Sequence, residues 1–272
     1  MTGVQTCALP ISVVLAAGVA DDLVGLRVAP KLALQVLAAG LAVAGGYTLD
    51  GITAPLTGRW IELGGFGGVV TVAWIVGITN AMNLIDGLDG LAAGVGVIAS
   101  AALCLVCLAE GRTEAAGLWA ALGGGLAGFL AYNFPPASIF LGDTGSLVVG
   151  YVMAILALES LAKSATAVVV LAPLLALGLP VVDTGLAVVR RLLVSGVGGI
   201  GRADQEHIHH RLVGEGMSHR GAVLVLYALC GVLGAVAFLA VVAQRRVTVV
   251  AVVGAALAIV IAARWLRARA RR

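Results

Sequence analysis

LAAGVGVIASAALCLVCLA, residues 91–109, decides the fold class, because these nineteen residues contain no charged side chain. A helix of about 20 apolar residues spans a bilayer, and backbone in lipid is helical unless strands alternate polar and apolar positions. Similar runs recur, which gives apolar segments near residues 11–20, 31–47, 67–84, 91–109, 115–133, 146–161, 166–193, 221–242 and 247–266. We therefore predict an all-α, polytopic integral membrane protein with about nine transmembrane segments, the first of them partial.

The composition of the whole chain supports this class. Its 272 residues are 61% hydrophobic and 11% charged, with a mean hydropathy of +1.08. Soluble domains carry about 25% charged residues, so most of this surface must face a lipid bilayer, and no nucleic-acid partner is expected. Cys104 and Cys107 are spaced as a redox or metal pair, but two small apolar residues on a lipid-embedded helix explain them more simply.

Basic residues are divided unevenly between the two sides of the predicted membrane domain. Of the 17 Lys and Arg residues, twelve fall in segments 21–31, 86–90, 133–146 and 193–221, just before the last of these (Arg190 and Arg191), or at the C-terminus, and five fall on the other side. Loops rich in Lys and Arg stay in the cytoplasm, so the first set marks the cytoplasmic face. The unusual polar motifs all lie on that face, where we expect the active site.

Three acidic motifs follow or precede apolar segments on this face. The first is the adjacent pair Asp21 and Asp22, and the second is NAMNLIDGLDGLAAG, residues 80–94, in which an amide or acid recurs every third residue. Such a stripe shares one helix face and can bind a cation, a sugar or a nucleobase. The simpler alternatives are a solvated acid pair and two Asp-Gly turns, although turns do not account for the asparagines.

The third motif, FLGDTGSL, residues 140–147, reads as a loop that enters a helix. Thr144 or Ser146 is available as its cap, and Asp143 is thereby placed near a helix N-terminus, where anions such as phosphate also bind. Phe140 could offer a flat apolar face to a base, and packing against lipid or core is the alternative.

A fourth motif, HIHHRL, residues 207–212, places three histidines among basic residues. Histidine clusters bind transition metals, but this loop has no cysteine, so a zinc site would need carboxylates from elsewhere. The histidines could instead bind phosphates together with Arg202, Arg211 and Arg220, or form a solvated basic loop.

Together the four motifs indicate phosphoryl transfer at a membrane surface. Hard carboxylate oxygens favour Mg²⁺, with Mn²⁺ as a substitute, and such a metal offsets the repulsion between two phosphate-bearing substrates. In their order and content the motifs resemble those of the bacterial polyprenyl-phosphate N-acetylhexosamine-1-phosphate transferases. This resemblance spans about residues 20–220, and it implies attack of undecaprenyl phosphate on the β-phosphorus of a UDP-N-acetylhexosamine, with release of UMP. It leaves open whether transfer is direct or passes through an aspartyl phosphate, and whether the protein is a homodimer.

The resemblance also implies roles for individual residues. The catalytic set would be Asp21, Asp22, Asp86, His207, His209 and His210. The substrate-binding set would be Asn83, Asp89, Phe140, Arg202 and Arg211, with Asp89 and Phe140 near the uracil. Asp143 and Asp22 would hold the metal ion.

The branch within the family follows from two details. A phospho-N-acetylmuramoyl-pentapeptide transferase is expected to carry a Lys shortly after the aspartate pair and three contiguous histidines. Here Leu26 follows Gly25 and the histidines read HIHHRL, which favours the UDP-N-acetylglucosamine branch that initiates envelope glycans such as teichoic acid or O-antigen. An ion-coupled transporter is the alternative from another class, but it predicts acids at mid-span and inverted repeats.

The first residues do not fit this architecture. Only residues 11–20 precede the aspartate pair as an apolar segment, which is half of a bilayer-spanning helix. VQTCALPI, residues 4–11, also resembles the translation of a common sequencing adapter. We therefore expect residues 1–12 to be non-native, residues 13–272 to form a single transferase domain, and preceding helices to be missing.

Overall fold

The computed structural model describes residues 3–53, 59–162, 176–178, 180–181, 184–185, 212–214 and 216–242. Its helices are α1 (Gly3–Val24), α2 (Val28–Ala44), α3 (Gly67–Ile85), α4 (Leu91–Ala109), α5 (Thr113–Asn133), α6 (Gly142–Ala162) and α10 (His219–Val242). Within these residues five helices are long and apolar enough to cross a membrane, and α2 is a shorter apolar helix. The all-α polytopic membrane class is confirmed, while the predicted segments 166–193 and 247–266 fall largely or wholly outside the described residues.

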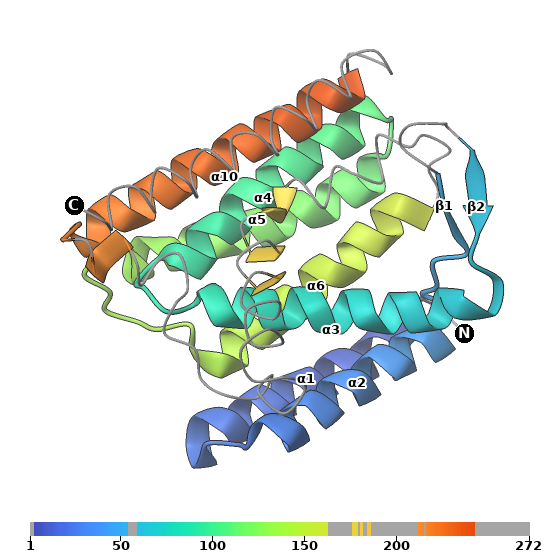
Figure 1. Ribbon diagram of the computed structural model, residues 1–272, viewed down its shortest axis with the longest axis horizontal. Helices are drawn as coiled ribbons and strands as arrows, with labels where there is room; N and C mark the ends of the chain where they lie inside the picture. The colour runs from blue at the N-terminus through green and yellow to red at the C-terminus, as the bar shows by residue number, and fades with distance from the viewer. Residues whose placement is uncertain are drawn as a thin grey trace.

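The helices pack in two groups joined by a central pair (Figure 1). Helices α4, α5 and α10 lie side by side in one group, α1 and α2 form the other, and α3 and α6 pack on each other between them. The α1–α2 connection, the end of α3 and the start of α6 lie at one end of the molecule. The motifs predicted on the cytoplasmic face are therefore gathered at a single end of the bundle.

A small β-hairpin lies at the opposite end, and the search for apolar runs did not predict it. Strands β1 (Gly51–Thr53) and β2 (Trp60–Glu62) pair antiparallel, with Ile52 opposite Ile61, and the short 3₁₀ helix η1 (Gly64–Phe66) leads into α3. These strands belong to a connection between membrane helices, where backbone groups can pair outside the hydrocarbon region.

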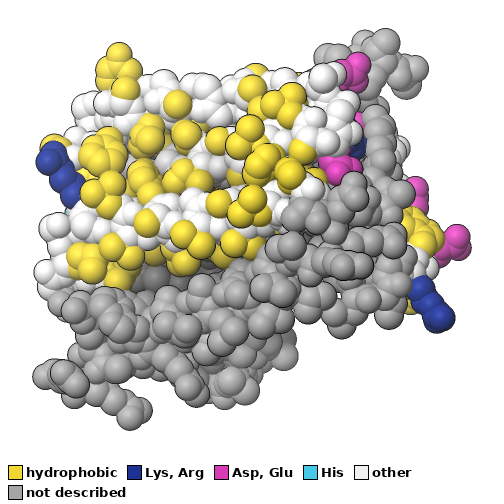
Figure 2. All heavy atoms as spheres, turned by 90° about the horizontal axis from the view of Figure 1, so that it is seen from above, with side chains coloured by type: hydrophobic (Ala, Val, Ile, Leu, Met, Phe, Trp, Pro, Cys, Tyr) yellow, Lys and Arg dark blue, Asp and Glu magenta, His cyan; other side chains and the backbone are white. Residues whose placement is uncertain are grey.

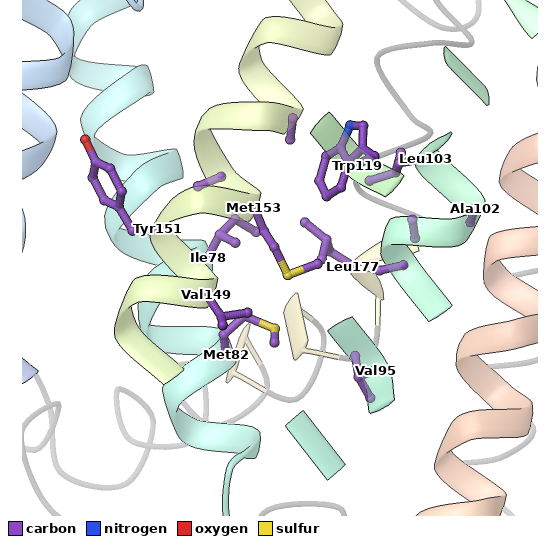
Figure 3. Packing of buried hydrophobic residues seen from close by; sticks show 14 of the residues in the cluster. Ile78, Met82, Val95, Ala102, Leu103, Trp119, Val149, Tyr151, Met153 and Leu177 are labelled. Carbon is purple, nitrogen blue, oxygen red and sulfur yellow. The ribbon is translucent and has the colours of Figure 1, made fainter. Parts of the chain in front are cut away.

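The core is formed by small and branched side chains that pack where the helices meet. Figure 3 shows Met153 of α6 pointing toward Leu177, with Ile78 and Met82 of α3 close by. On the outside, hydrophobic side chains cover the middle of one face while charged ones lie at its edges (Figure 2). This distribution is the one that a protein surrounded by lipid requires.

Helix α6 is fixed at its far end by a polar cluster in the core. Arg112 donates to the backbone carbonyls of Ser160 and Glu159, and Trp119 donates through Nε1 to Ser160 Oγ at 3.2 Å. Cys104 and Cys107 are both free thiols, and the Cys107 Sγ lies 3.6 Å from the same hydroxyl, so Cys107 packs in this buried cluster.

Candidate active site

The site is centred on the ammonium group of Lys31, in the first turn of α2. Its Nζ lies 2.7 Å from Asp21 Oδ2, 2.8 Å from Asp143 Oδ2 and 3.0 Å from Asn83 Oδ1. These three oxygens come from the end of α1, the start of α6 and the last turn of α3. A single cation thus joins the three acidic motifs, as the mutual repulsion of their carboxylates requires.

The two adjacent aspartates have different tasks in the structure. Asp21 turns toward Lys31, and its second oxygen accepts a hydrogen bond from the backbone N–H of Leu26 at 2.6 Å. Asp22 turns toward α6, where it accepts hydrogen bonds from the N–H groups of Asp143 and Thr144, at 2.8 and 3.0 Å, and from the Thr144 hydroxyl.

Asp22 therefore caps the N-terminus of α6 from another helix. A carboxylate is well placed there because it satisfies orphan N–H groups and faces the positive end of the helix dipole. The prediction that Thr144 or Ser146 caps this helix is wrong, because α6 already begins at Gly142 and both residues lie inside it, where their hydroxyls donate to Asp22 and to the Asp143 carbonyl. Both oxygens of Asp22 are engaged in this cap.

Two glycines allow α1 and α6 to approach closely enough for the cap. Gly142 has a φ of +65°, and a Cβ there would lie 3.0 Å from Asp22 Oδ2. A Cβ on Gly18 of α1 would lie 2.4 Å from the Thr144 Cα. Side chains at either position would separate the helices and move Asp22 away from the start of α6.

The asparagine stripe of α3 divides into two functions. Asn83 donates through Nδ2 to Asp143 Oδ1 and, at 2.9 Å, to Ser146 Oγ, so it orients the third acid of the site. Asn80, one turn deeper, exchanges amide hydrogen bonds with the buried Gln35 of α2. Asn83 therefore belongs to the site, whereas Asn80 joins α2 to α3 beneath it.

Asp86 lies at the end of α3 with no cation beside it in the described part of the chain. Among the described residues no group donates a hydrogen bond to its side chain, and Asp143, Asp22 and Asp89 all act on it with like charge. Burial, with this repulsion added, raises the pKa of Asp86 from 3.8 to about 7. A carboxylate in that situation is a strong candidate for binding a proton or a metal ion.

Asp89 lies beside the loop that joins α5 to α6, and Phe140 lies within that loop. Asp89 Oδ2 accepts a hydrogen bond from the Ala137 N–H at 3.0 Å, and Phe140 is 71% exposed. The exposure of Phe140 rules out packing in the protein core and leaves its ring open to lipid or to a ligand. Arg220, considered as a phosphate ligand, donates through Nε to Pro135 O at 2.7 Å.

The remaining predicted site residues, Arg202, His207, His209, His210 and Arg211, lie outside the described residues. Within the described part of the chain, no group of three His, Cys, Asp or Glu side chains is arranged to hold a metal ion. Asp86 and Asp143 nonetheless supply hard oxygens, and Mg²⁺ needs only one or two carboxylates when water and phosphates complete its coordination.

Sequence reasoning missed Lys31, which it counted only as a cytoplasmic charge. The available signal was its position, since it is the one charged residue within the apolar segment 31–47 and lies ten residues after Asp21. A charge at the end of a membrane helix is costly unless it is paired, and its nearest acids in sequence are the aspartate pair.

Comparisons with known proteins identify the family of the chain. A model of the family described as glycosyl transferase family 4 matches residues 4–161. A probable undecaprenyl-phosphate N-acetylglucosaminyl 1-phosphate transferase of Bacillus subtilis (strain 168) is 42% identical over 217 residues, which cover 80% of this chain and 60% of that protein. The decaprenyl-phosphate N-acetylglucosaminephosphotransferase of Mycolicibacterium smegmatis is 33% identical over 267 residues, which cover 85% and 62%.

A shorter similarity joins the chain to a second kind of enzyme. A phospho-N-acetylmuramoyl-pentapeptide-transferase of Desulforudis audaxviator is 45% identical over 111 residues, which cover 41% of this chain and 30% of that protein. The chain spans 60% to 62% of the length of the two N-acetylglucosamine-phosphate transferases, over most of its own length.

Proposed function

The chain belongs to glycosyl transferase family 4, and we propose that it transfers N-acetylglucosamine-1-phosphate from UDP-N-acetylglucosamine to undecaprenyl phosphate, with release of UMP. The observation that carries the proposal is the site around Lys31, where one ammonium group joins carboxylates from two motifs at the end of a membrane bundle. The names of the relatives that match most of the chain support a polyprenyl-phosphate acceptor, undecaprenyl in one and decaprenyl in the other, and N-acetylglucosamine phosphate as the transferred group.

The reaction joins two anions, and the residues of the site reduce their repulsion. One oxygen of the lipid phosphate bonds to the β-phosphorus of the UDP-sugar, and the bond from that phosphorus to the oxygen bridging the two phosphates breaks. UMP leaves with the bridging oxygen. Lys31 offers the positive charge that draws a phosphate to this position, and Asp21, beside it, orients the lipid phosphate.

The acids of α3 and α6 suit the binding of a divalent metal ion. Asp86 and Asp143 would hold Mg²⁺, or Mn²⁺ in its place, and the bound ion would supply charge neutralisation at the diphosphate. Asn83 keeps Asp143 oriented, and Asp22 keeps the start of α6 in place. Both oxygens of Asp22 accept hydrogen bonds from α6, just as both oxygens of Asp143 accept them from Lys31 and Asn83, so Asp22 caps the helix and stays a predicted metal ligand beside Asp143.

Asp89 and Phe140 remain the proposed contacts of the uracil, and His207, His209, His210, Arg202 and Arg211 those of the diphosphate. The protein is a multi-pass membrane protein. We propose that it lies in the bacterial inner membrane with the site on the cytoplasmic face, where UDP-sugars are made. Its product would begin the membrane stage of an envelope polysaccharide.

Membranes containing the overproduced chain test the proposal directly. With undecaprenyl phosphate, Mg²⁺ and UDP-[¹⁴C]N-acetylglucosamine, we expect a labelled lipid, and we expect Asp143→Asn to abolish it. The shorter similarity makes UDP-N-acetylmuramoyl-pentapeptide the competing donor. Label entering lipid from that donor alone would replace the proposed substrate by the peptidoglycan precursor, and no labelled lipid from either donor would end the proposal.

A further inference from the structure

The first turn of α4 is held by a tyrosine from α10. The Tyr227 hydroxyl donates a hydrogen bond to the backbone carbonyl of Gly90 at 2.5 Å. Its ring occupies the space that a side chain on Gly94 would need, since a Cβ there would lie 2.0 Å from the Tyr227 Cζ. Gly90 itself has a φ of +76°, which sets the turn between Asp89 and α4.

The same turn is held from its other side by the connection between α5 and α6. The Gly90 N–H donates to Asn133 Oδ1 at 3.0 Å, and Asn133 Nδ2 donates to the Ile139 carbonyl at 2.9 Å. Asp89 accepts from the Ala137 N–H of this connection. The backbone of Gly90 is therefore fixed at both its N–H and its carbonyl, directly next to Asp89.

Helix α10 also holds the α5–α6 connection itself. Arg220, in the first turn of α10, donates through Nε to the carbonyl of Pro135, which is buried. Tyr227 and Arg220 thus contact the two segments that carry Asp89 and Phe140, and neither reaches the Lys31 cluster. The positions of the proposed uracil contacts depend on this pair, because a loop without such bonds samples more conformations.

We propose that Tyr227 and Arg220 are positioning residues that set the affinity of the site for the uridine nucleotide. This inference rests on the proposed function, in which Asp89 and Phe140 contact the uracil. It goes further by assigning nucleotide affinity, as distinct from lipid affinity, to a helix that carries none of the proposed substrate contacts. The lipid phosphate is held at the Lys31 cluster, so its affinity does not depend on α10.

The variant Tyr227→Phe tests the proposal, because it keeps the ring beside Gly94 and removes only the hydroxyl. A single hydrogen bond of ordinary strength corresponds to about a five- to tenfold change in affinity. We expect the Kd for UMP, measured by calorimetry, and the KM for UDP-N-acetylglucosamine to rise about fivefold. The KM for undecaprenyl phosphate should stay unchanged, and the melting temperature should fall by no more than the roughly 2–4 °C that the loss of one such bond accounts for.

Tyr151→Phe is the matched control. Its hydroxyl donates to the Ala38 carbonyl at 3.4 Å, and Figure 3 shows the ring pointing away from Met153 and Leu177. This variant also removes a buried tyrosine hydroxyl, but on the α2 side of the bundle. We expect it to leave both KM values and the Kd for UMP unchanged. An equal effect of the two variants on UMP binding would overturn the proposal.

Gly94→Ala provides a second test, because a methyl group at that position displaces the Tyr227 ring. The double variant Gly94→Ala/Tyr227→Phe should bind UMP no more weakly than Gly94→Ala alone. Additive losses would contradict the proposal, as would unchanged UMP binding in Tyr227→Phe or an equal rise in both KM values. The variants could change the Kd for UMP as expected in a protein that shows no transferase activity. That result would refute the proposed function and leave this inference standing.

Discussion

The replacement Asp86→Asn should make the metal-free protein more stable at alkaline pH. Asparagine resembles the protonated carboxyl in shape, but it carries no charge to bury beside Asp143, Asp22 and Asp89. Burial and repulsion raise the pKa of Asp86 from 3.8 to about 7, so the folded state holds its proton over a range in which the unfolded chain has already lost it. Ionised Asp86 therefore destabilises the fold increasingly as pH rises from about 4 to about 7, and the cost is complete above that range.

The magnitude follows from the two pKa values. A difference of one in pKa corresponds to about 1.4 kcal/mol. Ionised Asp86 therefore lowers the free energy of unfolding by about 4 kcal/mol at pH 8 and by about 1.5 kcal/mol at pH 5. For a protein of this size 1 kcal/mol shifts the melting temperature by roughly 2–4 °C. We expect Asp86→Asn to raise the melting temperature by roughly 8–16 °C at pH 8 and by about a third of that at pH 5, as upper limits.

Thermal unfolding of the detergent-solubilised protein in EDTA at both pH values measures this effect. Added Mg²⁺ should stabilise the unsubstituted protein at pH 8 and should have much less effect on Asp86→Asn. Asp89→Asn is the control, because its carboxylate accepts the Ala137 N–H and its replacement should give a much smaller alkaline gain, limited to the repulsion that it removes from Asp86. A melting temperature of Asp86→Asn that is unchanged or lower at pH 8 would refute the reasoning, as would an equal gain at both pH values.

Three further predictions concern the rest of the site. Lys31→Met should lower kcat/KM at least about 100-fold, because Asp21 and Asp143 lose their shared cation. Lys31→Arg should retain part of the activity. Equal activity of Lys31→Met and the unsubstituted protein would exclude Lys31 from the site. Gly142→Ala should destabilise the protein by about 1–2 kcal/mol in denaturation experiments, because of its positive φ and the contact with Asp22, while Gly40→Ala, which faces open space, should not. EDTA should abolish turnover, and Mg²⁺ or Mn²⁺ should restore it; restoration by Zn²⁺ alone would indicate a histidine metal site instead.

The segment that decided the fold class was also predicted with its bounds, because both of its ends have local signals. Residues 91–109 contain no charge, Gly90 precedes them in a left-handed conformation, and Glu110 and Gly111 follow. The start of α2 was predicted three residues late, at residue 31, although the helix includes Pro30. Proline is tolerated in the first turn of a helix, so α2 begins at Val28 and includes Lys31.

The acids of the site could be predicted because acidic and amide residues that recur at a regular spacing are visible in the sequence itself. Their partners could not be predicted in the same way. The cap of α6 comes from Asp22, which is 120 residues away from Gly142, and the cation between Asp21 and Asp143 comes from a third helix. Local rules assigned the cap to Thr144 or Ser146, since only a tertiary structure brings α1 against α6.

The position of the phosphorus label tests the central claim most directly. UDP-N-acetylglucosamine labelled with ³²P in the β-phosphate is incubated with undecaprenyl phosphate, Mg²⁺ and membranes containing the chain. The account predicts that the label enters the lipid and that the released nucleotide is unlabelled UMP. Release of labelled UDP would mean that the sugar alone is transferred, and it would contradict the account.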